Sequence, residues 1–299
     1  MAINVGRLKE WAFGEVEHRY TERESALYAL CLGFGADPLD ERALRYVAGD
    51  ALRAAPFMAA VLAFPGQWMR DPRSGIDWKR VVHGEQGVRL HRPLAATGCL
   101  VGRTRVSAVI DKGREKGAVV QMERSLYDMT SGDLLATVEQ LNFCRGDGGF
   151  SEDGQPSDAS PPSMAWAPSC APDDICDLPT RPETALLYRL CGDPNPLHFD
   201  PAVARSAGFA RPILHGLATY GIAGHAVLRT ACGYDAGRLR SLHARFSAPV
   251  YPGETLRTEL WRDGPWVRFR CRVLERDQLV LTAGRAELVP TTDRSVHQN

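Results

Sequence analysis

Hydrophobic positions along the chain fall into two blocks, and the first block begins with helical spacing. Apolar residues recur on one face of three segments, and Pro65-Gly66 cuts the third short. The predicted helices cover residues 24–33 and 40–48, and any helix in the apolar segment 55–64 is expected to be cut short. Apolar and polar residues then alternate in segments separated by turn formers, which is typical of an antiparallel meander. The predicted strands cover residues 88–90, 99–110, 117–128 and 134–145.

The second block repeats this order of elements. Its predicted helices cover residues 183–190, 201–208 and 216–231, and its predicted strands cover 238–249, 254–261, 266–275 and 278–289. Each block therefore reads as helices followed by about four antiparallel strands. The pattern predicts an α+β protein built from two similar halves.

Short motifs recur in the two blocks at nearly constant spacing. Leu27-Tyr28-x-Leu30-Cys31 returns as Leu187-Tyr188-x-Leu190-Cys191, an offset of 160 residues. Two further pairs keep an offset of 156: Pro56-Phe57-Met58 with Pro212-Ile213-Leu214, and Pro93-Leu94 with Pro249-Val250. Because three landmarks keep their order and spacing, we infer a duplicated unit.

Composition changes sharply between the two blocks. A Gly-rich run at 146–149 is followed by Ser, Asp, Pro, Gly and Ala over 151–172, which is typical of a linker. We therefore predict a first half at 1–148, a linker at 149–178 and a second half at 179–299.

Composition excludes several classes of function. Lys+Arg and Asp+Glu number 36 each, so no net charge favours nucleic acid or an anionic membrane. Eight scattered cysteines form no disulfide or zinc pattern, and the longest apolar run is too short to span a bilayer. Without a signal peptide or a terminal Ser-Lys-Leu address, we expect a cytoplasmic protein that binds neither nucleic acid nor membrane. Motifs of serine hydrolases, NTPases, dinucleotide-binding enzymes and zincins are absent from the sequence.

The candidate chemistry lies in a turn of the second half. Asp193, Asn195 and His198 alternate with two prolines, which fix φ and disfavour helix in the residues before them. A carboxylate and an imidazole that share a water form a competent acid–base pair, because histidine titrates near neutrality. Asn195 can hold the histidine or the water by hydrogen bonds. Taken alone, such a turn is more often structural than catalytic.

A helix start follows this turn. Gly216 begins a helix of small residues, and no Ser, Thr, Asp or Asn directly precedes it as a cap. Free N–H groups at such a start suit a developing oxyanion. The first half has Ala59-Ala60 where the second has His215-Gly216. We therefore place the active site in the second half.

The first half also lacks the polar residues of the turn. It has Gly33-Phe34 where the second half has Gly192-Asp193, and Pro38-Leu39-Asp40 where the second half has Pro196-Leu197-His198. Other candidates have simpler structural interpretations. Tyr188 and Cys191 occur in both copies and read as core, and His215 and His225 read mainly as structural. The remaining candidates, His83, His91 and His243, fit no motif.

These residues carry a resemblance to a known family. Tyr188, the run Gly192-Asp193-Pro194-Asn195-Pro196-Leu197-His198, and Arg211-Pro212-Ile213-Leu214-His215-Gly216 resemble the signature of (R)-specific enoyl-CoA hydratases, or hydratase 2, among the MaoC-like dehydratases. In the first half, Asp37-Pro38-Leu39-Asp40 and Gly84-Glu85-Gln86 are similar to the two-domain members.

The resemblance implies a fold and an activity. The fold is a double hot-dog, in which two antiparallel sheets each wrap a helix and join into one extended sheet. The first half is degenerate and accommodates the acyl chain. The activity is hydration of trans-2-enoyl-CoA to (R)-3-hydroxyacyl-CoA, or the reverse, in fatty acid metabolism such as β-oxidation. No metal or cofactor is implied beyond the acyl-CoA substrate, and a homodimer is possible.

The resemblance also assigns roles to residues. Asp193, His198, Asn195 and Gly216 are the expected catalytic residues, and Gly216, His215, Leu217 and Tyr188 the expected substrate-binding residues. Two alternatives stay open. Hot-dog proteins include acyl-CoA thioesterases, and the degenerate first half also fits a non-catalytic acyl-CoA-binding subunit.

Overall fold

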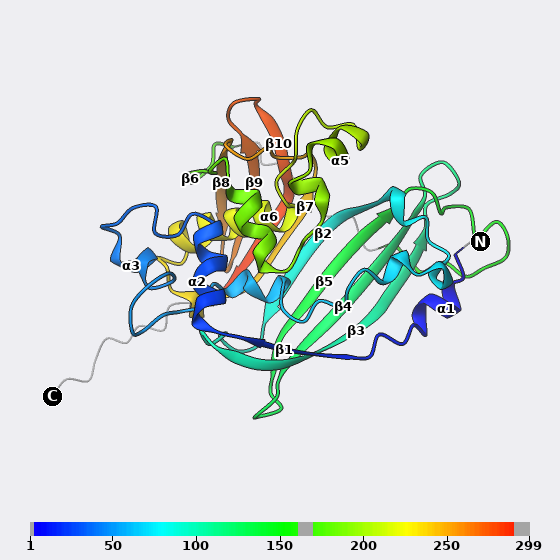
Figure 1. The fold of residues 1–299 in the computed structure, drawn as a ribbon, viewed down its shortest axis with the longest axis horizontal. Coiled ribbons are helices and arrows are strands. Elements are labelled where there is room, and N and C mark those ends of the chain that lie inside the picture. Colours follow the sequence, from blue (N-terminus) through cyan, green and yellow to red (C-terminus); the bar gives the residue numbers. More distant parts are fainter. Residues whose placement is uncertain (1–2, 161–169, 290–299) are drawn as a thin grey trace.

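A single ten-stranded sheet forms the framework of the protein. The computed structural model describes residues 3–160 and 170–289, and the sheet in these residues has the order β1-β3-β4-β5-β2-β7-β10-β9-β8-β6 (Figure 1). All its neighbouring strands are antiparallel. The first five strands in chain order come from the first half, and the other five from the second. No described helix is long and apolar enough to cross a membrane.

The elements have the following bounds. The strands are β1 Glu15–Tyr20, β2 Val81–Leu90, β3 Gly98–Asp111, β4 Ala118–Asp128, β5 Leu134–Cys144, β6 Asp174–Pro179, β7 Leu239–Phe246, β8 Thr255–Asp263, β9 Trp266–Val273 and β10 Gln278–Leu288. The α-helices are α1 Val5–Lys9, α2 Glu22–Cys31, α3 Glu41–Leu44, α4 Thr184–Tyr188, α5 Pro201–Ser206 and α6 Gly216–Thr230. The 3-10 turns that matter below are η1 Pro56–Ala60, η5 Arg189–Cys191 and η6 Pro196–His198.

The two halves join where β2 pairs with β7. Glu85 lies opposite Arg245 in this antiparallel pair. Its carboxylate also forms ion pairs with Arg245 at 2.7 Å and with His243 at 3.1 Å. The expected joining of two sheets into one is therefore confirmed, and charged side chains from both halves hold the junction.

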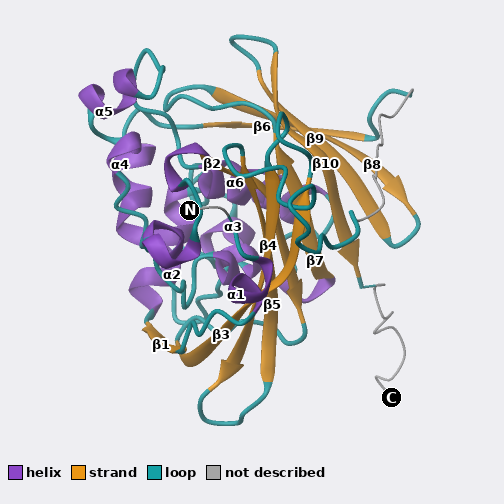
Figure 2. Ribbon diagram, turned by 90° about the vertical axis from the view of Figure 1, so that its right-hand side faces the viewer, coloured by secondary structure: helices purple, strands orange, loops and turns teal. Residues whose placement is uncertain are grey.

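Helix α6 is the buried helix of the second half, and the curved sheet wraps around it and the shorter helical segments (Figure 2). Its residues from Ala218 to Leu228 are all buried. Two of its glycines allow close packing against the first half. A Cβ on Gly221 would lie 2.8 Å from Leu32, and one on Gly224 would lie 2.7 Å from Phe57.

This packing gives a stability prediction. Replacing Gly224 with Val should lower the free energy of unfolding by about 1–3 kcal/mol, because the added atoms have no space against Phe57 and Leu242. Urea unfolding of the purified protein measures the change. Arg229→Ala, at an exposed position on the same helix, is the control and should change stability by less than about 0.5 kcal/mol. Equal effects of the two substitutions would contradict this account of the packing.

The corresponding helix of the first half is cut short, as the sequence predicts. Within the apolar segment 55–64 only the 3-10 turn η1 forms, and it ends at Ala60. Ala63 adopts a left-handed conformation with φ 48°, which is unfavourable for a residue with a Cβ. The chain therefore leaves the helical path before Pro65-Gly66, and the expected degenerate central helix is confirmed.

Two strands were missed by the sequence prediction. Strand β1 pairs with β3, and β6 pairs with β8 at the other edge of the sheet. All but the last residue of β6 lies within the predicted linker 149–178, so sheet begins at Asp174. Its pattern Asp-Ile-Cys-Asp-Leu-Pro is short and rich in turn-forming residues, which hid it among the linker residues. Much of the remaining predicted linker, 161–169, lies outside the described residues.

The structure refines the comparison of the two copies. Asp40 caps α3 by accepting from the N–H groups of Arg42 and Ala43, and Asp200 caps α5 in the same way, 160 residues later. Asp40 therefore corresponds to Asp200, and the prediction that paired it with His198 was wrong. The first copy contains no counterpart of His198.

Candidate active site

The turn that carries Asp193 is held by its own backbone. The N–H of Asn195 donates to Oδ1 of Asp193 at 3.2 Å, and the N–H of Leu197 donates to Oδ1 of Asn195 at 3.2 Å. Asn195 thereby caps η6. Its side-chain oxygen shapes the turn that positions both catalytic candidates, and the expected hydrogen bond of Asn195 to the histidine or a water stays a prediction.

His198 presents one ring nitrogen to the site. The residue is 8% exposed, and its Nδ1 lies 2.9 Å from the carbonyl oxygen of Ile213. Because a carbonyl only accepts, Nδ1 carries the hydrogen in this bond and Nε2 keeps a lone pair. Burial lowers the pKa of His198 below its ordinary value, against smaller opposing effects of the Ile213 carbonyl and the Asp193 carboxylate. The ring is therefore a neutral base at neutral pH.

His215 contacts both Asp193 and His198. Its ring stacks on His198 with centroids 3.7 Å apart, and its Nε2 donates to the backbone carbonyl of Asp193 at 3.1 Å. Burial first, and then the neighbouring His198, lower the pKa of His215 to about 4. A neutral, 1% exposed ring that contacts both catalytic candidates acts mainly as a positioning residue.

The separation of the donor atoms suits one shared water. One carboxylate oxygen of Asp193 and one ring nitrogen each of His198 and His215 lie within 4.8 Å of one another. Two hydrogen bonds of about 2.8 Å that meet at a tetrahedral water span about 4.6 Å. This upper limit allows Asp193 and His198 to hold a single water between them, as the sequence predicts.

The same donor atoms could in principle bind a metal ion, but their geometry is unsuitable. The rings of His198 and His215 are stacked, with only 26° between their planes. Imidazole lone pairs lie in the ring plane, so the lone pairs of His198 and His215 lie in two nearly parallel planes. The two lone pairs therefore do not converge on one point that is about 2 Å from both nitrogens, as binding of zinc requires. The absence of a metal from the reaction stays a prediction, and this geometry supports it.

Gly216 supplies the backbone N–H that the sequence predicts at the site. It is the exposed first residue of α6, and the N-cap residue His215 makes no side-chain capping bond. The first N–H groups of a helix have no partner within the helix. A Cβ at this position would lie 3.3 Å from the ring of Phe246 on β7. The predicted uncapped helix start is therefore present, and its N–H is open to a ligand.

The two other expected substrate-binding residues lie deeper. Leu217 is half-buried and packs against the main hydrophobic core. Tyr188 is 1% exposed, and its ring lies 5.0 Å from that of His215. Both positions favour support of the site over direct substrate contact.

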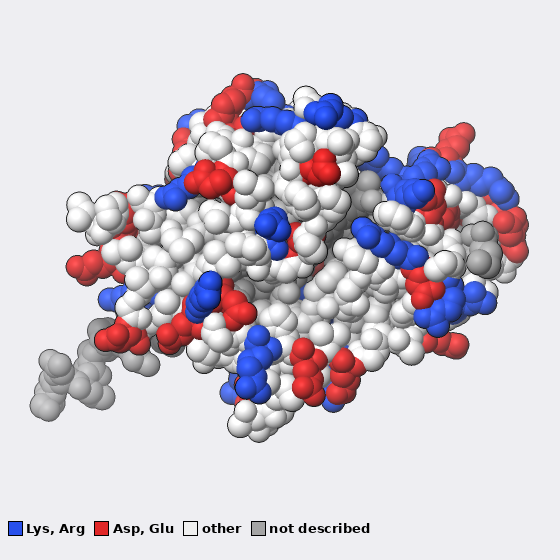
Figure 3. Space-filling model, in the orientation of Figure 1, with Lys and Arg blue, Asp and Glu red and all other residues white. Residues whose placement is uncertain are grey.

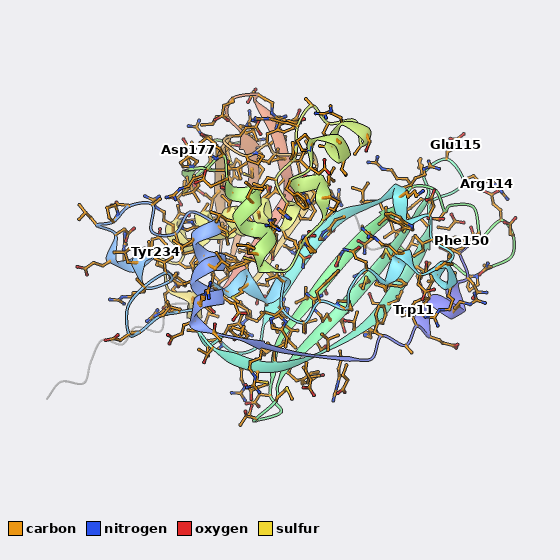
Figure 4. All side chains as sticks on the ribbon, viewed as in Figure 1. Trp11, Arg114, Glu115, Phe150, Asp177 and Tyr234 are labelled. Atoms are coloured by element: carbon orange, nitrogen blue, oxygen red, sulfur yellow. The ribbon has the colours of Figure 1, made fainter. Side chains whose placement is uncertain are left out.

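The pseudo-equivalent place in the first half is filled by aromatic rings. Phe34, which takes the sequence position of Asp193, stacks on His225 at 3.7 Å and lies 4.9 Å from Tyr46. Tyr234, labelled in Figure 4 beside α2 and α3, closes the cluster by a hydrogen bond between its hydroxyl and His225. The cluster leaves no acid–base pair there, which agrees with the placement of the site in the second half.

Sequence reasoning missed one residue next to the site. His83, on β2 of the first half, has its ring 4.8 Å from that of Phe246, which in turn lies against Gly216. The field of Asp193 also reaches His83. The available signal was its place directly before Gly84-Glu85-Gln86, a segment of the first half that shares the family resemblance.

The surface of the protein is hollowed between the α5 side of the second half and the loops of the first (Figure 3). Basic side chains lie beside this hollow, and acidic side chains lie close to them.

Comparisons with known proteins agree with this geometry. Residues 165–283 match the family described as MaoC like domain, and residues 18–146 match the MFE-2 hydratase 2 N-terminal domain. The peroxisomal enoyl-CoA hydratase 2 of Arabidopsis thaliana is 37% identical over 279 residues, which covers 89% of this chain and 90% of the relative. The enoyl-CoA hydratase ChsH3 of Mycobacterium tuberculosis is 38% identical, with coverage of 92% and 94%.

Solved structures support the same assignment. A MaoC-like dehydratase from Phytophthora capsici superposes with a TM-score of 0.84 at 31% identity, covering 96% of this chain and 99% of its own. A Mycobacterium tuberculosis protein described as having a double hotdogfold has a TM-score of 0.51 at 16% identity, with coverage of 91% and 94%, and this likeness concerns the fold alone. The predicted double hot-dog architecture is therefore confirmed, and the chain belongs to the MaoC-like dehydratase family as a two-domain protein of the hydratase 2 type.

Proposed function

We propose that the protein is a hydro-lyase that adds water to trans-2-enoyl-CoA to give (R)-3-hydroxyacyl-CoA, and that also catalyses the reverse dehydration. The observation that carries the proposal is the cluster of Asp193, His198 and His215, whose ligand atoms lie within 4.8 Å of one another, directly before the open N–H of Gly216. The relatives named as enoyl-CoA hydratases and as a 3-hydroxyacyl-thioester dehydratase support it.

The geometry gives each residue a role. Asp193 and the Nε2 lone pair of His198 accept hydrogen bonds from the water and orient its oxygen toward C3 of the enoyl group. His198 takes a proton as the C–O bond forms, and the proton is then delivered to C2 on the same face. His215 and Asn195 keep the pair in place through the bonds described above.

Gly216 stabilises the charge that this addition creates. As water adds to C3, negative charge moves to the thioester oxygen in an enolate-like state. An N–H at the start of α6 meets this oxygen, and the helix dipole favours negative charge there. One such donor contributes about 3–4 kcal/mol in other enzymes.

The protonation state of His198 predicts how the activity depends on pH. Activity requires the neutral ring, so kcat/KM is complete above its pKa and is lost as pH falls through it. Because burial lowers this pKa below 6.5, the acid limb should have its midpoint below pH 6.5. Measurement of kcat/KM from about pH 5 to about pH 8 locates the limb. A midpoint above 6.5 would contradict a neutral, buried base.

A direct assay separates this function from its alternatives. Purified protein is mixed with crotonyl-CoA and with a longer trans-2-enoyl-CoA, and loss of the conjugated double bond is followed together with release of free thiol. We expect hydration without thiol release. Thiol release from saturated acyl-CoA would favour a thioesterase, and tight binding without turnover would favour a non-catalytic subunit.

Several features of the biology stay predictions. The cytoplasmic location competes with the peroxisomal names of several relatives, among them those from Arabidopsis thaliana and Mus musculus. The homodimer and a role in β-oxidation rest on the family resemblance.

A further inference from the structure

His83 lies on an irregularity that is built into β2. The pairing of β2 with β5 shifts register between His83 and Glu85, which marks a β-bulge. Gly84 is required within it, because a Cβ there would lie 2.4 Å from the ring of Phe143. Bulges occur beside active sites, where they re-aim a side chain. This bulge sets the direction of the His83 ring.

The bulge is fixed from both sides. Nε2 of His83 lies 3.1 Å from the carbonyl oxygen of Glu85, so Nε2–H donates to it. The Glu85 carboxylate is in turn ion-paired with Arg245 and His243 on β7. The hydrogen bond to Glu85 therefore fixes the orientation of the imidazole. Residues of the second half in turn hold Glu85 in place.

The imidazole contacts a residue that borders Gly216. Its ring and that of Phe246 have centroids 4.8 Å apart and planes at 63°. Phe246 lies 3.3 Å from the place of a Cβ on Gly216, so the two rings form a wall beside the oxyanion donor. A thioester bound at the Gly216 N–H would run along this wall.

The chemistry of the ring follows from its surroundings. Burial lowers the pKa of His83 to about 4, against smaller opposing effects of the Glu85 carbonyl, the Gln86 side chain and the Asp193 carboxylate. The ring is therefore neutral at neutral pH. With Nε2–H donating to Glu85, the lone pair of Nδ1 is left as a hydrogen-bond acceptor.

We propose that His83 is a substrate-positioning residue, whose Nδ1 accepts a hydrogen bond from the amide N–H of the pantetheine arm next to the thioester sulfur. This inference rests on the proposed function. An enoyl thioester has no donor of its own near its reacting atoms, and the cysteamine amide is the first donor along the arm. The degenerate half would thereby take part in the reaction through His83.

The test compares two crotonyl thioesters. One is the N-acetylcysteamine thioester, which keeps the amide, and the other is the S-butyl thioester, which lacks it. His83→Phe retains the aromatic contact with Phe246 but removes the acceptor. We expect kcat/KM for the amide substrate to fall by about tenfold, mainly through KM, and kcat/KM for the S-butyl substrate to change by less than about twofold. His83→Gln should recover part of the loss, and His91→Phe, on an exposed histidine just after β2, should have no effect.

The outcomes are distinct. Equal losses on both substrates would show that His83 only supports the wall, and no loss on either would show that it is not used. Both results overturn the proposal while leaving the hydratase intact. If the wild-type protein hydrates neither thioester nor crotonyl-CoA, the proposed function itself fails.

Discussion

Replacing Asp193 with Asn should lower kcat for enoyl-CoA hydration by about 10²–10⁴-fold and leave KM nearly unchanged. Asparagine has the same shape, and its oxygen can still accept from the N–H of Asn195 that now holds Asp193. It has no charge to orient the water or to balance a proton on His198. The loss therefore falls on the chemical step, which steady-state kinetics with crotonyl-CoA would show directly.

The chain offers a matched control for this substitution. Asp200 lies two residues beyond His198 and caps α5. Since Asn caps helices about as well as Asp does, Asp200→Asn should keep both the fold and the activity. Retention of full activity by Asp193→Asn, or equal losses in the two variants, would remove Asp193 from the mechanism.

Gly216→Pro should lower kcat/KM by about 10²–10³-fold, because proline has no N–H to bind the enolate oxygen. The backbone tolerates the change. Proline is favoured at the first position of a helix, and the preceding His215 already has φ −57° and ψ 135°, which a following proline permits. The variant thus removes the donor while α6 is expected to remain.

The control for this variant is Gly216→Ala. It introduces the Cβ that lies 3.3 Å from Phe246 but keeps the N–H. A loss of less than about tenfold in the alanine variant, together with the large loss in the proline variant, would assign the effect to the N–H. Similar losses in both would indicate crowding by Phe246 and would contradict the role of the oxyanion donor.

The sequence predicts the catalytic turn well because local rules govern it. Proline restricts the residues around Asn195, and an uncapped glycine marks the start of α6, so both features are visible without knowledge of the fold. The duplication then separates the copy that carries the candidate residues from the copy that lacks them. These local signals account for the confirmed helix start and for the meeting of Asp193 with His198.

Residues that meet across the sheet could not be predicted in this way. His83 reaches the site only because β2 pairs with β7 and a bulge turns the strand, and neither event leaves a periodic pattern. The match of Asp40 with His198 failed because it followed the Pro-Leu pair that precedes both residues, and so departed from the offset of 160 residues that the preceding motif shows. The shared capping bonds of Asp40 and Asp200 corrected it. The role of Asn195 likewise depends on which N–H its side chain meets.

The configuration of the hydration product tests the central claim most directly. In the proposed mechanism Asp193 and His198 hold the water from one side, so it should reach only one face of C3. Purified protein is incubated with trans-2-decenoyl-CoA, and the 3-hydroxyacyl-CoA formed is resolved by chiral chromatography against both standards. The account predicts the (R) product alone, and its loss in Asp193→Asn. Formation of the (S) product, or free CoA thiol without hydration, would contradict it.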